Sequence, residues 1–231
     1  MAKVVKKTAK KAATKRVTKK KITNLIIIDA SGSMQSKVNE VIGGLKQIFS
    51  QIRKDMEKDK KKVSMRNIVL DFSSGGDIRT LIDSSSIDDL KDSVADNYST
   101  RGMTALYDAI GKGLSMVDKN DYAVFINILT DGEENDSKEY TSSDITKMIQ
   151  EAKAKNWAVT FMGTTEQSVW LAQSMGISKG NTMQFADNAA GVQTSLSKTL
   201  VARNAYYNGA MSNTGLEGFA TLGELDSLLE D

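Results

Sequence analysis

Apolar residues form two kinds of pattern along this chain of 231 residues. Residues 22–29 (ITNLIIID) and 122–131 (YAVFINILTD) are short, nearly continuous apolar runs. Such runs are typical of parallel strands that are buried on both faces. Residues 63–72 and 157–163 are further candidate strands, and residues 182–186 are a shorter one. We expect these five segments to be strands.

Between these segments, apolar residues recur every three or four positions, which indicates helices with one buried face. The longest such helix is expected to begin near Ser33 and to end in the charged segment EKDKKK at residues 57–62. Further helices are predicted at residues 87–96, 104–117, 144–155, 168–176 and 188–207.

The order of these elements predicts the fold class. Gly75, Gly76 and Asp77 are typical turn residues, so residues 78–82 are expected to return as an antiparallel edge strand. After this hairpin, strands and helices alternate. That alternation predicts an α/β fold with a mainly parallel sheet, one antiparallel edge strand and helices on both faces.

The composition narrows the possible chemistry. The chain has no Cys and no His, which excludes disulfides, Ser-His triads and metal sites with thiolate or imidazole ligands. A metal would need oxygen ligands, which favours Mg²⁺, Ca²⁺ or Mn²⁺. No apolar run approaches the ~18–20 residues of a membrane-spanning helix, and no secretion signal is recognisable. We therefore expect a cytoplasmic protein, with a virion or another non-secretory destination left open.

The charge is unevenly distributed. Residues 1–21 hold ten of the 31 Lys and Arg residues and no acid, which leaves 21 basic and 29 acidic residues, a net charge of −8, in the rest. This arm has too few apolar residues to fold alone, so disorder is expected. Its candidate nucleic-acid-binding residues are Lys6, Lys7, Lys10, Lys11, Lys15, Arg16, Lys19, Lys20 and Lys21. Binding of nucleic acid through release of counterions is one possible role; a solubilising or partner-docking tail is the other.

Side chains with oxygen atoms follow the two continuous apolar strands. Asp29, Ser31 and Ser33 come directly after the first, and Asp131 ends the second. Ligand sites of parallel sheets gather beyond the C-terminal ends of strands, so the two carboxylates meet if these strands are neighbours. Thr104, in the segment RGMTALYDA that leads into a predicted helix, adds a third loop at the same end. Five such ligands leave at least one of the roughly six positions of Mg²⁺ open.

The segments DASGSM, GMT and LTDG, each beside the expected element, together resemble the metal-ion-dependent adhesion site of von Willebrand factor A domains. The family pattern D-x-S-x-S, then T, then D falls on Asp29, Ser31, Ser33, Thr104 and Asp131. The resemblance covers about residues 22–207. It implies a doubly wound six-stranded sheet and a Mg²⁺ ion whose open position takes an Asp or Glu from a protein partner. Met103, where the family often has Gly, and the absence of Cys make the chain look more like intracellular bacterial and viral members.

Some charged residues near the candidate site have more than one interpretation. Glu133, Glu134 and Asp136 could form a solvated loop, an acidic rim or a second cation site. Arg101 could be a surface residue or could steer a carboxylate toward the metal. Residues 208–231 are expected to form a flexible tail that ends in the acidic segment GELDSLLED. This tail is either a plain surface tail or an acidic ligand for the metal site of its own or a neighbouring copy.

These observations favour a metal-dependent protein-interaction module that is not an enzyme. The alternative is a nucleic-acid-associated structural or assembly protein that uses its basic arm. A metal-dependent hydrolase or phosphotransferase is disfavoured, because the chain has no P-loop and no G-x-G-x-x-G after a strand. Asp29 also lacks the second Asp of the D-x-D pattern of metal-dependent phosphatases.

Overall fold

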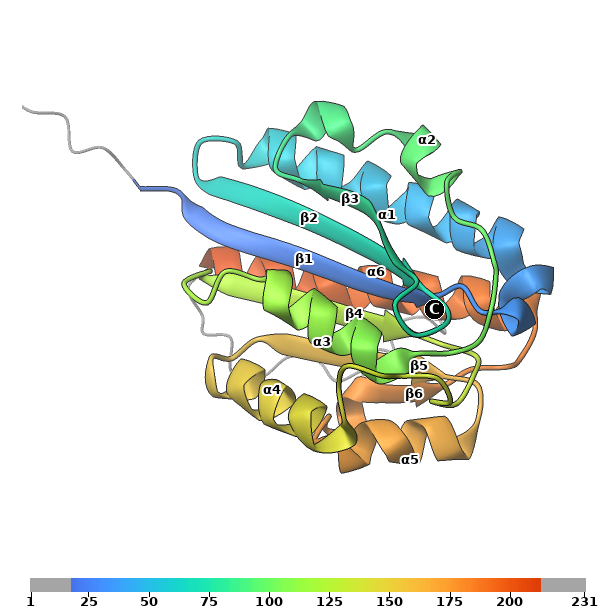
Figure 1. Ribbon diagram of the computed structural model, residues 1–231. Helices are drawn as coiled ribbons and strands as arrows, with labels where there is room; N and C mark the ends of the chain where they lie inside the picture. Colours follow the sequence, from blue (N-terminus) through green and yellow to red (C-terminus); the bar gives the residue numbers. More distant parts are fainter. Residues whose placement is uncertain (1–17, 213–231) are drawn as a thin grey trace, which may run out of the picture.

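The computed structural model describes residues 18–212, and its six strands form one sheet in the order β3-β2-β1-β4-β5-β6 (Figure 1). The strands are β1 (Lys20–Asp29), β2 (Val63–Phe72), β3 (Ile78–Ser84), β4 (Ala123–Leu129), β5 (Ala158–Gly163) and β6 (Thr182–Gln184). All neighbouring strands are parallel except β2 and β3. The predicted mainly parallel sheet with one antiparallel edge strand is confirmed.

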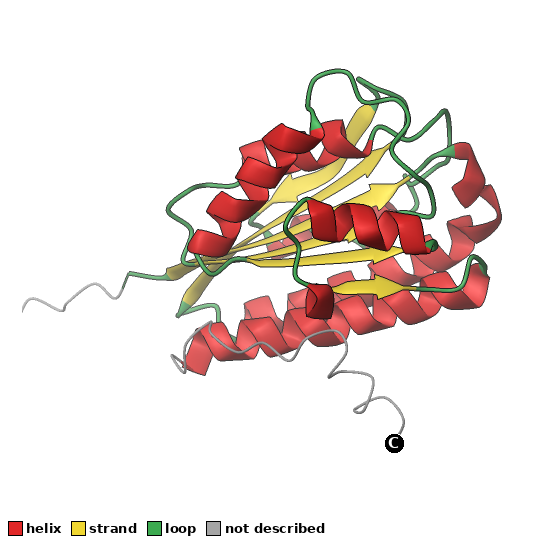
Figure 2. Cartoon of the chain, turned by 90° about the horizontal axis from the view of Figure 1, so that it is seen from below, coloured by secondary structure: helices red, strands yellow, loops and turns green. Residues whose placement is uncertain are grey.

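Helices cover both faces of the sheet, as Figure 2 shows. They are α1 (Val38–Lys58), α2 (Asp92–Ala95), α3 (Leu106–Met116), α4 (Ser142–Ala154), α5 (Glu166–Ser174) and α6 (Ala189–Ser212). Side chains of α1, α2 and α6 pack in the core on one face, and those of α3, α4 and α5 pack in the core on the other.

The central position of β1 explains its continuous apolar sequence. Ile26 and Ile28 pack in the core beneath α1 and α6, whereas Leu25 and Ile27 pack in the core beneath α3. Successive side chains of a strand point to opposite faces, so a strand covered on both sides is apolar at most positions; Thr23 and Asn24 are the buried polar residues between Ile22 and Ile28. Asp29 is the first charged residue of this run, at the edge where the strand leaves the core.

Several elements begin or end at residues other than those predicted. Strand β1 begins at Lys20, because the Lys20 backbone N–H donates to the Lys62 carbonyl and its Nζ donates to the Ala210 carbonyl. Helix α6 continues to Ser212 rather than 207, and this extension buries Ala210. The first long helix begins only at Val38, after a 3₁₀ turn over Gly32–Lys37. The predicted helix at 87–96 is divided into a 3₁₀ turn, Ile87–Asp89, and the short α2.

Some predictions concern residues outside the described part of the chain. They include the acidic end of the C-terminal tail and the basic residues Lys6, Lys7, Lys10, Lys11, Lys15 and Arg16. Within residues 18–212, no helix combines the length and the apolar character that a membrane crossing requires.

Candidate metal centre

The two predicted carboxylate ligands emerge from neighbouring strands. Asp29 is the last residue of β1, and Asp131 follows two residues after the end of β4. These strands pair in parallel, with Ile28 opposite Leu129. Both carboxylates therefore lie at the same edge of the sheet, and both are buried. The two strands are neighbours, which is the condition under which the sequence predicts that the two carboxylates meet.

Hydrogen bonds connect the two serines to these carboxylates. The Ser31 backbone N–H donates to Asp29 Oδ1 at 2.7 Å, and the hydroxyls of Ser31 and Ser33 lie 3.0 Å apart. The Ser33 hydroxyl donates to Asp131 Oδ1 at 2.6 Å. Four of the five predicted ligands thus form one connected group. Ser33 is exposed, so the group opens to solvent on that side.

Thr104 reaches the same place from the loop before α3. A methyl group at Gly132 would lie 3.0 Å from Thr104 Oγ1 and 3.6 Å from Asp29 Oδ2, so these two oxygen atoms flank the glycine. Thr104 is only 4% exposed, and its hydroxyl has no hydrogen-bond partner among residues 18–212. Among the described residues, the buried side-chain oxygen or nitrogen atom that lacks a partner is Asn127 Oδ1, so Thr104 Oγ1 itself keeps some access to solvent. The lone pairs of this oxygen atom are free to bind a cation.

The electrostatics of Asp29 also fit a cation. Burial raises the pKa of Asp29 from 3.8 to about 6, although hydrogen bonds from Thr130 and Ser31 oppose this shift. The nearby charge of Asp131 raises the pKa further. A divalent cation between the carboxylates would offset both the desolvation and the repulsion. Two carboxylates and three hydroxyls, with no nitrogen or sulfur, form a ligand set that suits a hard cation such as Mg²⁺.

Two residues at the site were not among the predicted ones. The Thr130 hydroxyl donates to Asp29 Oδ2. Lys37 Nζ contacts Asp131 Oδ2 at 2.5 Å and Asp187 Oδ1 at 2.6 Å. Burial lowers the pKa of Lys37, but its hydrogen bonds to Asp131 and Asp187 outweigh burial and hold that pKa above its ordinary value. Lys37 follows Ser33 by four positions, about one helical turn, so the two residues lie on the same side of the helical segment. This spacing is the sequence signal that could have identified Lys37 as part of the site.

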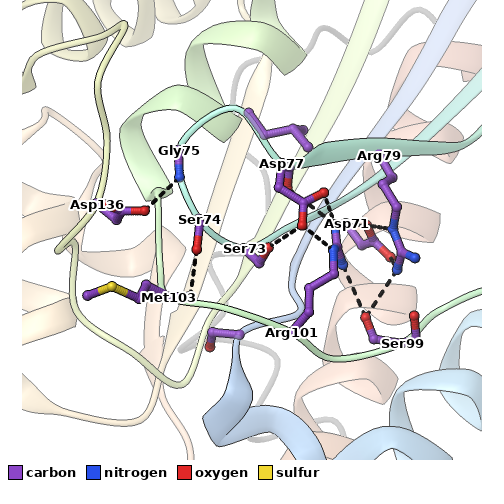
Figure 3. Close-up of polar contacts among 12 residues, drawn as sticks. Asp71, Ser73, Ser74, Gly75, Asp77, Arg79, Ser99, Arg101, Met103 and Asp136 are labelled. Carbon is purple, nitrogen blue, oxygen red and sulfur yellow. Dashed lines mark hydrogen bonds and ion pairs between the residues drawn. The ribbon is translucent and has the colours of Figure 1, made fainter.

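An ion-pair network holds the loop that carries Thr104, as Figure 3 shows. The Asp71 carboxylate is buried between the guanidinium groups of Arg79 and Arg101. Arg101 also pairs with Asp77 at 2.6 Å, and its backbone N–H donates to the Ala30 carbonyl. Arg101 therefore joins the loop to the end of β2 and to the DASGS segment. Its guanidinium group has these ion-pair partners within the chain, a structural role that was not among the predicted ones.

The acidic residues that follow Asp131 stabilise backbone segments. Glu134 accepts hydrogen bonds from the backbone N–H groups of Tyr107 and Ser137, and Asp136 accepts one from Gly75. Within residues 18–212, no three Asp, Glu, His or Cys residues gather in a way that could hold a metal ion. A second cation site at Glu133, Glu134 and Asp136 is therefore not formed there.

An apolar side chain stands beside the candidate ligands. Met103, directly before Thr104, is 51% exposed, and its backbone N–H donates to the Ser74 hydroxyl. Figure 3 shows its side chain pointing away from the ion-pair network. It is one of three large apolar residues that are exposed among those the structure describes; the others are Tyr122 and Trp170.

Comparison with known proteins gives structural matches at low sequence identity. The pilus adhesin SpaC from Lactobacillus rhamnosus GG has a TM-score of 0.60 and 15% identity, covering 79% of this chain and 30% of the adhesin. The vWF domain of the type V pili tip protein Mfa5 from Porphyromonas gingivalis has a TM-score of 0.59 and 8% identity, covering 81% of this chain and 96% of that domain. At such identities, these likenesses show the fold.

A third structure is proximal thread matrix protein 1 from the mussel byssus with a zinc-occupied MIDAS motif. It has a TM-score of 0.57 and 14% identity, covering 79% of this chain and 48% of that protein. The chain thus spans less than half of the mussel protein and less than a third of the adhesin. No curated protein sequence matches the chain.

The sequence model of the von Willebrand factor type A domain matches residues 25–199, from within β1 to within α6. This range includes every predicted metal ligand. Because the match extends over most of the sequence, the chain belongs to the von Willebrand factor type A domain family.

Proposed function

We propose that the domain binds Mg²⁺ and uses the open position of the metal to bind an Asp or Glu side chain of a protein partner. The proposed ligands are Asp29, Ser31, Ser33, Thr104 and Asp131. The observation that carries the proposal is their convergence from three separate loops, together with the unpartnered Thr104 hydroxyl. Because all five ligands are oxygen atoms, Mg²⁺ is preferred, and Mn²⁺ or Ca²⁺ could replace it.

The proposed role is binding without catalysis. The chain has no His and no Cys, the side chains that most often act as general base or nucleophile. The residues that border the candidate site make structural contacts, as the ion pairs of Arg101 and the backbone hydrogen bonds of Glu134 illustrate. The exposed Met103 would add an apolar contact for a partner beside the metal.

Partner capture from an extract of the producing cells tests this proposal. Partners that bind in Mg²⁺ are expected to be lost in EDTA, to return when Mg²⁺ is restored, and to be lost with Asp29→Asn. Asp118→Asn is the matched control, because Asp118 is an exposed carboxylate near the opposite end of the sheet, where it pairs with Lys21. Capture that is unchanged by EDTA and by Asp29→Asn would contradict the proposal.

A second candidate function is nucleic-acid binding, and one observation favours it. Exposed lysines gather where β1 begins and where α1 turns into β2, a surface we call the lysine pole: Lys19, Lys21, Lys58, Lys60, Lys61 and Lys62. These two segments are adjacent, because the Lys20 backbone N–H bonds to the Lys62 carbonyl. Three of these lysines have acidic partners: Glu57 pairs with Lys60, Asp59 with Lys62, and Asp118 with Lys21. Residues 1–17, with seven more Lys and Arg, join the chain at this pole.

The salt dependence of DNA binding tests this second function. The triple substitution of Lys60, Lys61 and Lys62 by Gln is expected to reduce the slope of log K against log salt by about 2 to 3, since each phosphate contact contributes about 0.9. Fluorescence anisotropy with a labelled duplex would measure the slope. Lys46→Gln, on the middle of α1, should leave it unchanged. An unchanged slope in the triple variant would exclude the lysine pole as the contact surface.

A further inference from the structure

Lys37 is a buried cation in direct contact with a candidate metal ligand. Its side chain is 4% exposed, and its Nζ contacts Asp131 Oδ2 at 2.5 Å, Asp187 Oδ1 at 2.6 Å and the Ser33 carbonyl at 3.2 Å. A lysine ammonium has three donors, and these three acceptors use all of them. The ammonium group is therefore held in place against Asp131 Oδ2.

Because of the position of Lys37, the two oxygen atoms of the Asp131 carboxylate have different partners. Oδ1 accepts the Ser33 hydroxyl and belongs to the candidate metal site, whereas Oδ2 is occupied by the ammonium group. Asp187 gives the ammonium a second carboxylate, but the Asp187 side chain is 64% exposed, so water screens its charge.

The charges of the site show what this ammonium group does. Asp29 and Asp131 together carry two negative charges, which would balance a divalent cation completely. With Lys37 included, a bound divalent cation leaves the buried site with a net charge of about +1. A positive charge at this distance repels the metal and attracts an anion that approaches its open position.

We propose that Lys37 determines the ligand preference of the metal site: its buried charge weakens metal binding and strengthens binding of an anionic carboxylate ligand. This inference depends on the proposed function and adds a specific residue to it. Lys37 acts through Asp131 and the metal, so it is a positioning residue and does not touch the ligand. The ligand class it selects is a charged carboxylate over a neutral oxygen donor such as an amide or a hydroxyl.

The test compares Lys37→Met with the wild-type protein in two titrations. Methionine keeps an unbranched chain of similar length without the charge. Mn²⁺ affinity is measured from the EPR signal of the free ion. Carboxylate affinity is measured from the relaxation of acetate methyl protons by the Mn²⁺-loaded protein at equal metal saturation. In Lys37→Met, we expect Mn²⁺ to bind about tenfold more tightly and acetate about tenfold more weakly.

Two further variants complete the design. Asp187→Asn removes the exposed partner of Lys37, so smaller changes of opposite sign are expected: weaker Mn²⁺ binding and tighter acetate binding. Lys46→Met is the matched control, since Lys46 is also on α1 and pairs with an Asp at 2.6 Å but lies far from the site along the helix. It should change neither affinity. Circular dichroism checks that each variant is folded, and Asp187→Asn keeps the test decisive if Lys37→Met does not fold.

The outcomes separate this inference from the proposed function. If Lys37→Met weakens Mn²⁺ binding, or leaves acetate binding unchanged, Lys37 only holds Asp131 in place and the inference is wrong. If the wild-type protein itself fails to bind Mn²⁺, or relaxes acetate no more than Asp29→Ala does, the proposed function is wrong and the inference falls with it.

Discussion

Asp29→Asn is expected to abolish the stabilisation of the domain by Mg²⁺. In the wild-type protein, Mg²⁺ at a free concentration of 100 times its Kd should raise the free energy of unfolding by about 2.7 kcal/mol. The variant should show no increase, because Asp29 is one of only two carboxylates in the candidate ligand set and an amide carries no charge to attract the cation. Thermal unfolding followed by circular dichroism, with Mg²⁺ and with EDTA, measures both values. Asp118→Asn should respond to Mg²⁺ as the wild type does.

Without metal, Asp29→Asn is expected to raise the free energy of unfolding of the domain. The pKa of Asp29 is raised to about 6 by burial, so ionising this carboxylate costs stability in the metal-free fold. Protonated Asp29 contributes fully to the free energy of unfolding below pH about 4, and this contribution is lost as the pH rises through about 6. In EDTA at pH 7.5, Asp29→Asn should therefore be more stable than the wild type, by up to ~3 kcal/mol.

The effect of Mg²⁺ on the wild type should follow the same titration. At pH 5, Asp29 is mostly protonated in the metal-free fold, so Mg²⁺ must displace a proton and should stabilise the protein less than at pH 7.5. A shift in melting temperature with Mg²⁺ that persists in Asp29→Asn would contradict the assignment of Asp29 as a ligand.

Arg203→Met is expected to lower the free energy of unfolding by about 3–5 kcal/mol. Arg203 lies on α6 and is 2% exposed; its guanidinium group pairs with Asp55 of α1 and donates to Asn24 Oδ1 of β1 at 3.1 Å. Removing it leaves the Asp55 carboxylate without its cation in a place where water has little access. Urea unfolding at neutral pH measures the loss.

A double variant distinguishes this cause from a simple loss of packing. Replacing both partners, as in Asp55→Leu with Arg203→Met, removes the uncompensated charge and should recover most of the lost stability. Arg66→Met is the matched control: Arg66 makes a bidentate pair with Asp83, and both side chains are about one third exposed, so the cost should stay below about 1 kcal/mol. A double variant as unstable as Arg203→Met would refute this explanation.

The strands of the sheet could be predicted from the sequence because a strand that is buried on both faces consists mostly of apolar residues. Strands β1 and β4 are covered on both faces, and both are continuous apolar runs. The positions of Asp29 and Asp131 follow from the general geometry of parallel strands. For Thr104 the sequence offers a weaker signal: it lies in a loop that leads into a helix at the same end of the sheet, and the resemblance to a known family supports its role as a ligand.

Contacts between distant residues and the ends of helices were not predictable in the same way. The pairs of Lys37 with Asp187 and of Arg203 with Asp55 join residues about 150 positions apart, and no local pattern encodes them. The extension of α6 to Ser212 is accompanied by the burial of Ala210, whose carbonyl accepts a hydrogen bond from Lys20 at the other end of the described chain. Tertiary packing decided these features.

Strand β1 joins the two candidate binding regions of the domain. Its ten residues begin at the lysine pole and end at Asp29, and at ~3.3 Å per residue they span about 30 Å. β1 is hydrogen-bonded on both sides, to β2 and β4, so this separation is fixed. If both regions bind, the domain would act as a rigid spacer: the contact with a nucleic acid and the contact with a protein carboxylate would be held at opposite ends of one strand.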